Sequence, residues 1–268
     1  MEMNSTMYLR EKPLCSHDDE EDFSFSCNPE QIIKQYPELI PKHVAIIPDG
    51  NRRWAAAQEK SPNAGHKHGA DIIIDTVKAA KEIGIKVVTL YVFSTENWLR
   101  SPEEIAGLMW LIENYLIEQK DQMIENGICF NTIGNLTKVP ESLQKTIEEV
   151  REATAHLNDV NLVLAVNYGG RDEITRAVRS YLDESIKKGI TPDQIKEEDI
   201  SRFMDTAKWG DPDLLIRTGG EKRISNFMLW QISYTEIRTI DVLWPDFTPA
   251  HLYNAVLHYQ TCERRLGR

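Results

Sequence analysis

Short apolar runs of strand length alternate along this chain with longer segments in which apolar residues recur at helical spacing. The short runs cover residues 43–47, 86–93, 128–133, 161–166 and 214–216, and a weaker one covers 240–243. The helical segments are residues 68–83, 102–125, 140–156, 171–188 and 249–265. Strands that are apolar on both faces and alternate with helices are typical of a parallel sheet covered on both sides. The pattern predicts an α/β fold with a single domain, in which helices flank a largely parallel six-stranded sheet.

The first 28 residues differ from the rest, because they are polar, carry an acidic block at 18–22 and have no periodic apolar pattern. We expect residues 1–28 to form a mobile tail and residues 29–268 to form the folded domain. No apolar run approaches the roughly 18 residues that an integral membrane segment needs, and no secretory signal is recognisable. The four cysteines lack metal-site spacing. We therefore predict a soluble intracellular protein of the cytoplasm, or of the plastid stroma if a transit peptide has been removed.

Polar residues and glycines follow four of the predicted strands, at the point where each strand ends. The clusters occupy residues 48–54, 94–100, 167–171 and 217–226. The carboxyl ends of parallel strands share one edge of a sheet, and ligands of open α/β sheets bind at that edge. We therefore expect the four clusters to converge on one crevice.

The chemistry of these clusters favours phosphate. Guanidinium groups bind phosphate oxygens through paired hydrogen bonds, and the candidates are Arg53, Arg100, Arg217 and Arg223. Gly50 and its neighbours let the backbone approach a ligand. Asp49 and Glu236 are carboxylates among these arginines, and Mg²⁺ beside phosphate takes one or two carboxylates plus substrate oxygens. The residues thus predict a diphosphate site with Mg²⁺.

Each feature alone has an ordinary structural explanation. Asp49-Gly50 and Gly219-Gly220 fit simple turns, single arginines are common surface charges, and tryptophans such as Trp54 are common core residues. The coincidence of four clusters at one sheet edge favours a functional site. Neither glycine pair completes a P-loop or dinucleotide motif, and no serine elbow or zinc-protease motif occurs. With 31 basic and 42 acidic residues the net charge is −11, which makes a nucleic-acid partner unfavourable.

Six stretches resemble the cis-prenyltransferase family, which includes undecaprenyl diphosphate synthase. They are DGNRRWA at 49–55, AGHKHG at 64–69, FSTENW at 93–98 with Arg100, NYGGRDEI at 167–174, and the long stretch at 211–236, closed by DVLWPDF at 241–247. They cover about residues 42–265 in the family's order. The resemblance implies a catalytic domain at 29–268 with a hydrophobic tunnel, isoprenoid diphosphates as small-molecule substrates, and a homodimer.

The resemblance also implies roles for individual residues. Asp49 is similar to the essential aspartate that handles Mg²⁺ and diphosphate, and Glu236 is similar to a second metal carboxylate. The allylic diphosphate would be bound by Gly50, Asn51, Arg53 and Arg100, and Trp54 would also contact substrate. The second diphosphate, usually isopentenyl diphosphate, would be bound by Arg217, Arg223 and Ser225. The catalytic group around the reacting carbons would be Asp49, His66, Ser94 and Asn97.

The chain departs from the family's pattern at several positions. Pro48 stands where the family usually has Met, Pro62 where long-chain bacterial members have an arginine, and Lys222 where a His is common. Glu236-Ile237-Arg238-Thr239 replaces the usual Glu-Leu-Tyr-Phe, which places a new cation two residues from the expected metal ligand. These changes put repeated chain elongation in doubt and leave the ionisation machinery present.

Four functions therefore remain open. The first is a short-chain synthase that condenses dimethylallyl diphosphate with isopentenyl diphosphate and releases pyrophosphate. The second is an irregular coupling of two dimethylallyl diphosphates to a branched lavandulyl-type diphosphate. The others are a long-chain polyprenyl synthase and a non-catalytic scaffold subunit, and the presence of Asp49, Asn51 and Arg53 argues against the scaffold.

Overall fold

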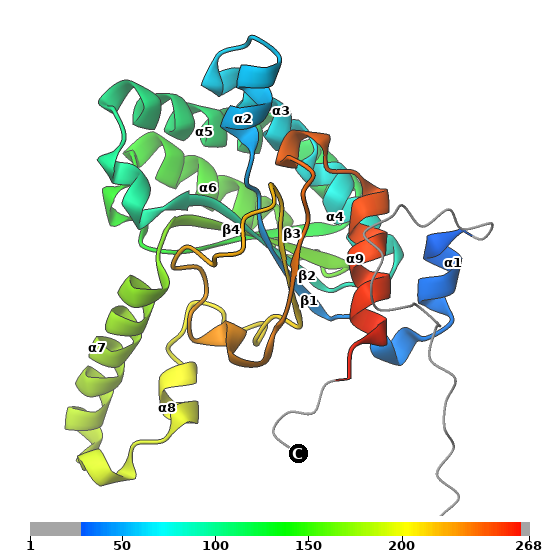
Figure 1. The fold of residues 1–268 in the computed structure, drawn as a ribbon. Coiled ribbons are helices and arrows are strands. Elements are labelled where there is room, and N and C mark those ends of the chain that lie inside the picture. The colour runs from blue at the N-terminus through cyan, green and yellow to red at the C-terminus, as the bar shows by residue number, and fades with distance from the viewer. Residues whose placement is uncertain (1–27, 264–268) are drawn as a thin grey trace, which may run out of the picture.

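The computed structural model describes residues 28–263. Six parallel strands form one sheet in the order β3-β4-β2-β1-β5-β6. Their bounds are β1 His43–Ile47, β2 Val87–Ser94, β3 Ile128–Ile133, β4 Val160–Tyr168, β5 Leu214–Arg217 and β6 Glu236–Thr239. Helices flank the sheet, and α2 follows β1 above its upper edge (Figure 1). The predicted α/β fold with a six-stranded parallel sheet is confirmed.

Some helix ends agree with the ends of the helical segments predicted from the sequence, and others differ by several residues. Their bounds are α1 Pro29–Lys34, α2 Asn51–Ala57, α3 Pro62–Asp71, α4 Ile73–Glu82, α5 Pro102–Glu125, α6 Glu141–Thr154, α7 Gly170–Lys188, α8 Glu197–Ser201 and α9 Pro249–Thr261. In Figure 1, α7 and α8 extend away from the sheet as an arm. The expected tail lies outside the described residues except for Asn28, whose side chain caps α1 by accepting from the backbone of Glu30.

Two expected elements are corrected. The single helix expected at 68–83 begins earlier, at Pro62, and is divided at Ile72 into α3 and α4. The weak strand expected at 240–243 is not a strand, and β6 lies just before it. The backbone of 240–243 instead accepts hydrogen bonds from the Gly219–Gly220 turn, because Gly219 donates to Val242 and Gly220 donates to Ile240. This contact removes the segment from the ladder with β5.

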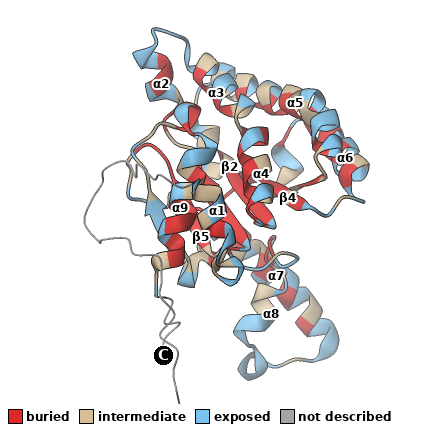
Figure 2. Cartoon of the chain, turned by 90° about the vertical axis from the view of Figure 1, so that its right-hand side faces the viewer, coloured by how far each residue is buried: buried red, intermediate tan, exposed pale blue. Residues whose placement is uncertain are grey.

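Alternate residues of β1 pack on opposite faces of the sheet. Val44 and Ile46 belong to the larger core cluster, with side chains from α4, α5, α6 and α9. Ala45 and Ile47 belong to a smaller cluster that includes Phe227. Buried residues follow the strands and the inner faces of the helices (Figure 2). Coverage of both faces explains why the central strands are apolar throughout.

In the described part of the chain, no helix has the length and apolar character that a membrane crossing requires.

Candidate active site

The carboxyl ends of β1 and β5 bring an acid and a base into contact. β1 and β5 are neighbours in register, with Ile47 opposite Arg217, and Asp49 follows two residues after Ile47. Arg217 donates from Nη2 to Oδ2 of Asp49 at 2.7 Å. The Arg217 side chain is only 5% exposed, whereas the Asp49 side chain is 28% exposed. Thr218 fixes the Asp49 backbone from both sides, since its Oγ1 accepts from the amide and donates to the carbonyl. The carboxylate is therefore held in one orientation at the sheet edge.

A tight turn after Asp49 sets the position of Arg53. Gly50 has a φ of +111°, and a Cβ there would lie 2.9 Å from Cδ2 of Leu243, so only glycine fits. Helix α2 starts at the next residue, Asn51, and places Arg53 about one turn after Asp49. The Nη2 atom of Arg53 lies 3.4 Å from Oδ1 of Asp49 and directly over Gly219, where a Cβ would be 2.3 Å away. The first and fourth clusters therefore meet at Asp49.

Arg217 also organises the loop that follows it. Its Nη1 donates to the backbone carbonyl of Arg223 and, at 2.9 Å, to Oγ of Ser225. The Arg223 side chain points outward, is 61% exposed and pairs with Glu221. Asp49, Arg53, Arg217 and Ser225 thus form one connected group, with Arg223 at its exposed rim.

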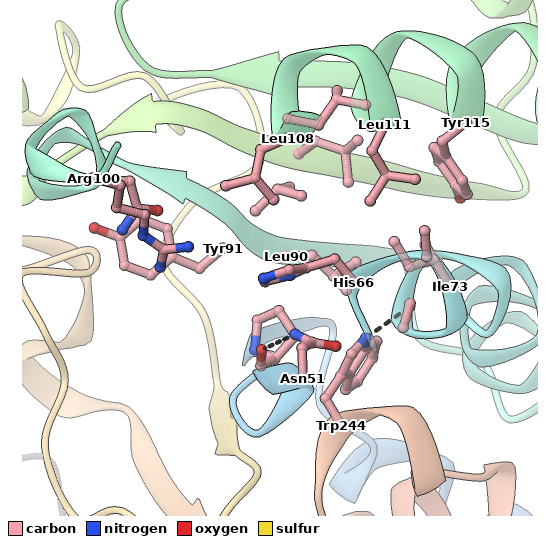
Figure 3. Close-up of a pocket in the computed structure, with 17 residues that line it drawn as sticks. Asn51, His66, Ile73, Leu90, Tyr91, Arg100, Leu108, Leu111, Tyr115 and Trp244 are labelled. Carbon is pink, nitrogen blue, oxygen red and sulfur yellow. Dashed lines mark hydrogen bonds between the residues drawn. The ribbon is translucent and has the colours of Figure 1, made fainter. Parts of the chain in front are cut away.

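The second and first clusters line a cavity of about 150 Å³ beside this group. Arg100 and Tyr115 lie at opposite ends of it, and Asn51 and His66 lie between them (Figure 3). The deeper wall is apolar and consists of Ile73, Leu90, Val92, Leu108, Leu111, Ile112, Leu164 and Trp244. Trp244 is fixed by a hydrogen bond of 2.7 Å from its Nε1 to the carbonyl of Gly69. The cavity therefore has a polar end at Asn97 and Arg100, and most of its remaining wall is apolar.

His66 is neutral in this cavity. Burial, Arg100 and Arg52 lower its pKa to about 4, and Glu104 opposes them. Its buried Nε2 has no hydrogen-bond partner within residues 28–263, and neither has Oδ1 of Asn51. Buried polar atoms in proteins are normally paired, so these two atoms are available to a ligand. Arg100 is oriented by Glu104, whose Oε1 accepts from Nη1 at 2.8 Å.

The geometry is that of an anion site beside a small apolar cavity, and comparisons with known proteins assign it to a family. A family model described as putative undecaprenyl diphosphate synthase matches residues 47–267. The chain belongs to this family. An isoprenyl transferase of Chlamydia abortus is 49% identical over 236 residues, which are 86% of this chain and 94% of that protein. An isoprenyl transferase of Clostridium tetani is 43% identical over 228 residues, 85% of this chain and 89% of that protein.

Solved structures agree with this assignment to the cis-prenyltransferases. Lavandulyl diphosphate synthase from Lavandula x intermedia, in complex with dimethylallyl diphosphate, superimposes with a TM-score of 0.82. It is 35% identical and covers 86% of this chain and 100% of its own. A probable undecaprenyl diphosphate synthase from Campylobacter jejuni has a TM-score of 0.72 and 31% identity, covering 85% of this chain and 99% of its own. The chain is a prenyltransferase.

Most of the expected site residues are near one another, and two are not. Ser94 and Asn97 start the short helix Thr95–Leu99, where Oδ1 of Asn97 accepts from the Ser94 amide at 3.1 Å, and Asn97 reaches the cavity. Trp54 does not line the cavity. Its ring is buried, stacks on His68 at 4.7 Å and donates from Nε1 to Oδ1 of Asp246, so the structure gives it packing contacts, and a role in binding substrate stays a prediction.

Glu236 is also not brought to Asp49 within the chain. It begins β6 and lies in register with Leu214, the first residue of β5, whereas the site lies beyond Arg217 at the other end. Three residues of parallel strand correspond to about 10 Å. Within one chain the structure therefore does not bring Glu236 to Asp49, because β6 runs parallel to β5 and begins at the end of the sheet opposite the site. The role of Glu236 as a metal ligand stays a prediction.

In this cis-prenyltransferase site, Asp49 is the carboxylate that lies where a Mg²⁺ ion would meet the diphosphate. Among residues 28–263, no group of three or more His, Cys, Asp or Glu side chains is arranged to hold a metal ion. Mg²⁺ at phosphate sites binds one or two carboxylates and completes its shell with phosphate oxygens and water. The residues thus fit Mg²⁺ together with a bound diphosphate, with Asp49 as the protein ligand.

Three residues of the site, Thr218, Tyr115 and Trp244, were not predicted from the sequence. Thr218 follows Arg217 directly, so its place in the fourth cluster was a usable indication. Trp244 contacts Gly69 across 175 residues of sequence, and no local pattern reports such a contact. Tyr115 occupies an ordinary core position of the α5 pattern, and only the cavity distinguishes it.

Proposed function

We propose that this prenyltransferase is a short-chain cis-prenyl diphosphate synthase, which condenses dimethylallyl diphosphate with isopentenyl diphosphate and releases pyrophosphate. The observation that carries the proposal is the small size of the cavity, about 150 Å³, together with its mostly apolar deeper wall. An engineered apolar cavity of that volume holds benzene, a ligand of six carbons. One five-carbon prenyl group therefore matches the space, and a long polyprenyl chain exceeds it.

The residues divide the work of the reaction. Arg53 lies where it can bind oxygens of the allylic diphosphate beside Asp49, with the prenyl group directed past Asn51 and His66 into the cavity. Arg217 holds the Asp49 carboxylate in place. The allylic C–O bond breaks, its electron pair leaves with the diphosphate, and cationic charge develops on the prenyl carbons. Cations stabilise that leaving group, and Mg²⁺ bound to Asp49 would add to the same stabilisation.

The second half of the reaction forms the new bond. The double bond of the second substrate attacks the allylic carbon, and a proton is then lost from the condensed product to the released diphosphate, to Asp49 or to the group around Asn97. His66 is neutral and adds no positive charge beside the carbons where cationic charge develops. Arg223, at the rim, would hold the second diphosphate together with Arg217 and Ser225.

The second candidate is the irregular coupling of two dimethylallyl diphosphates. The observation that favours it is the similarity to lavandulyl diphosphate synthase, whose structure contains dimethylallyl diphosphate. Arg238 also favours this candidate, because it is a departure from the family's pattern near the second-substrate site. It lies on β6 in register with Ile216, one residue before Arg217.

The experiment is to incubate the purified chain and Mg²⁺ with dimethylallyl diphosphate, with and without isopentenyl diphosphate. The products are then dephosphorylated and identified by gas chromatography with mass spectrometry. A linear ten- or fifteen-carbon cis alcohol that requires isopentenyl diphosphate supports the first proposal. A branched ten-carbon alcohol formed without it supports the second, and a polyprenol longer than twenty carbons contradicts both.

The proposal includes a homodimer. β6 is an edge strand, Ile237 on it is 52% exposed, and Tyr234 just before it is 68% exposed. Unpaired strand edges with exposed apolar residues favour association with another chain. Light scattering should give the mass of two chains, and Ile237→Lys should reduce it to that of one.

A further inference from the structure

The loop that carries Ser225 has an unusual backbone. Ser225, Asn226 and Met228 have φ values of +49°, +62° and +47°, in the left-handed region that non-glycine residues rarely adopt. Residues in such conformations persist only where the surrounding structure holds them. Phe227 supplies one such restraint, because it is fully buried and stacks on Tyr91 at a centroid distance of 4.4 Å.

Asn226 supplies further restraints on this loop, because it is hydrogen-bonded to two separate parts of the sheet edge. Its Nδ2 donates to Oε1 of Glu96 at 2.8 Å, in the cluster that follows β2. Its Oδ1 accepts from the amide of Arg171 at 3.1 Å, and its carbonyl accepts from the amide of Gly170 at 2.7 Å, at the start of α7. One residue of the fourth cluster is thus hydrogen-bonded to the second and third clusters.

These bonds act directly on the anion site. Ser225 is the neighbour of Asn226, and its Oγ accepts from Nη1 of Arg217 at 2.9 Å. The same guanidinium donates to Asp49 from Nη2. A shift of the loop at Asn226 would move Ser225 and release Arg217 from it. Asn226 itself does not line the cavity, and its side-chain hydrogen bonds go to Glu96 and to the amide of Arg171.

We infer that Asn226 is a positioning residue for the second diphosphate: through Glu96 and the start of α7, its side chain holds Ser225 and Arg217 in their binding arrangement. The inference rests on the proposed role of Ser225, Arg217 and Arg223 in binding that diphosphate. The Glu96 bond also connects this site to the helix Thr95–Leu99, which carries Asn97 toward the cavity. Asn226 therefore links the second-diphosphate site to the part of the chain that surrounds the reacting carbons.

Two substitutions at Asn226 separate the side chain from the backbone. Asn226→Gly removes both side-chain hydrogen bonds and leaves the positive φ unstrained, whereas Asn226→Ala removes the same bonds and adds strain. Glu96→Gln keeps an oxygen that can accept from Nδ2, and Glu96→Ala does not. The primary measurement is the binding of inorganic pyrophosphate to the full chain by calorimetry, because it requires no assumption about the product. The KM of each substrate, kcat and the melting temperature complete the set.

We expect Asn226→Gly and Glu96→Ala each to weaken pyrophosphate binding and to raise the KM of the second substrate on the order of tenfold, the effect of one charge-assisted hydrogen bond. The KM of the allylic substrate and the melting temperature should change little, and Glu96→Gln should stay within about twofold of the parent. The double variant Asn226→Gly/Glu96→Ala should lose less than the sum of the two single losses, because the residues share one interaction.

Two results would overturn the inference. If Asn226→Gly binds pyrophosphate as the parent does and only Asn226→Ala is impaired, the residue supplies backbone conformation alone. If both KM values and kcat worsen in proportion to a lower melting temperature, the role is stability. A parent chain that binds no pyrophosphate overturns the diphosphate site and the inference together. If the parent binds, the variants lose affinity and the product is a long polyprenol, only the short-chain proposal fails.

Discussion

Arg217 and Asp49 form an ion pair of 2.7 Å across the carboxyl ends of two neighbouring strands. Because Arg217 is almost fully buried, its charge is satisfied by this carboxylate and by the loop around Ser225. The pair orients Asp49 before any substrate arrives, and it gives the anion site a fixed cation. Preorganised charges of this kind stabilise a leaving group without reorganisation during the reaction.

Asp49→Ala should remove turnover while the chain stays folded. The substitution deletes the carboxylate that organises Mg²⁺ against the leaving diphosphate, and it leaves Arg217 bonded only to the loop at Arg223 and Ser225. Loss of charge stabilisation at this point should lower kcat on the order of 10²-fold or more. Asp49→Asn is the matched control for shape, and it should lose turnover to a similar extent. Circular dichroism checks the fold, and more than a tenth of the parent rate in saturating Mg²⁺ would refute the assignment.

Arg53→Ala and Arg223→Ala should affect different substrates. Arg53 lies beside Asp49 at the polar end of the site, whereas Arg223 lies at the rim and pairs with Glu221. Each substitution removes charge-assisted hydrogen bonds worth roughly 1.5–3 kcal/mol, so Arg53→Ala should raise the KM of the allylic substrate and Arg223→Ala that of the second. Equal changes of both KM values in both variants would contradict two sites. If both substrates are dimethylallyl diphosphate, binding of an unreactive analogue replaces the KM comparison.

The central strands could be predicted from the sequence because burial on both faces requires a continuous run of apolar residues. β1 was predicted with its observed bounds, since all five of its residues are buried. β6 was missed because an edge strand with Glu236 and Arg238 carries no apolar pattern, and its place depends on hydrogen bonds to β5. The convergence at Asp49 was predictable from strand ends, but the cavity depends on contacts such as Trp244 with Gly69, which are distant in sequence.

His43 should make the fold sensitive to mild acid. Its ring is bonded to the carbonyl of Gly210 and to Oγ1 of Thr89, and burial lowers its pKa from 6.5 to about 4. Between these values the unfolded chain binds the proton and the folded chain does not. The contribution of His43 to the free energy of unfolding is therefore fully present above pH 6.5. It falls by about 3 kcal/mol as the pH approaches 4. Lower pH should thus destabilise the fold.

Urea unfolding between pH 4.5 and 7.5 measures this effect. His43→Gln can still donate to Gly210 but cannot take up a proton, so its free energy of unfolding should depend less on pH than that of the parent. Its value at pH 7 should be lower, because the ring's packing is lost. Equal pH dependence in the two proteins would show that His43 does not control the acid sensitivity.

Product length should depend on the side chains at the end of the cavity opposite Arg100. Val92 lies on β2 and lines the cavity, and Tyr115 on α5 lies at the end opposite Arg100 (Figure 3). A close-packed wall has no spare volume, so each side chain limits how far a prenyl chain can extend. Val92→Ala should lengthen the product distribution modestly, and Tyr115→Leu should lengthen it by about one five-carbon unit or more, when isopentenyl diphosphate is in excess.

Tyr115→Phe separates the bulk of the ring from its hydroxyl. The hydroxyl is buried and has no hydrogen-bond partner among the described residues, so its removal should leave the free energy of unfolding unchanged or raise it by about 1 kcal/mol. The ring remains, and the product length should therefore stay that of the parent. If Val92→Ala and Tyr115→Leu also keep a ten-carbon product while remaining folded, the cavity wall does not set the limit. The limit would then lie in the second-substrate site near Arg238, and the irregular coupling of two dimethylallyl diphosphates would become the better proposal.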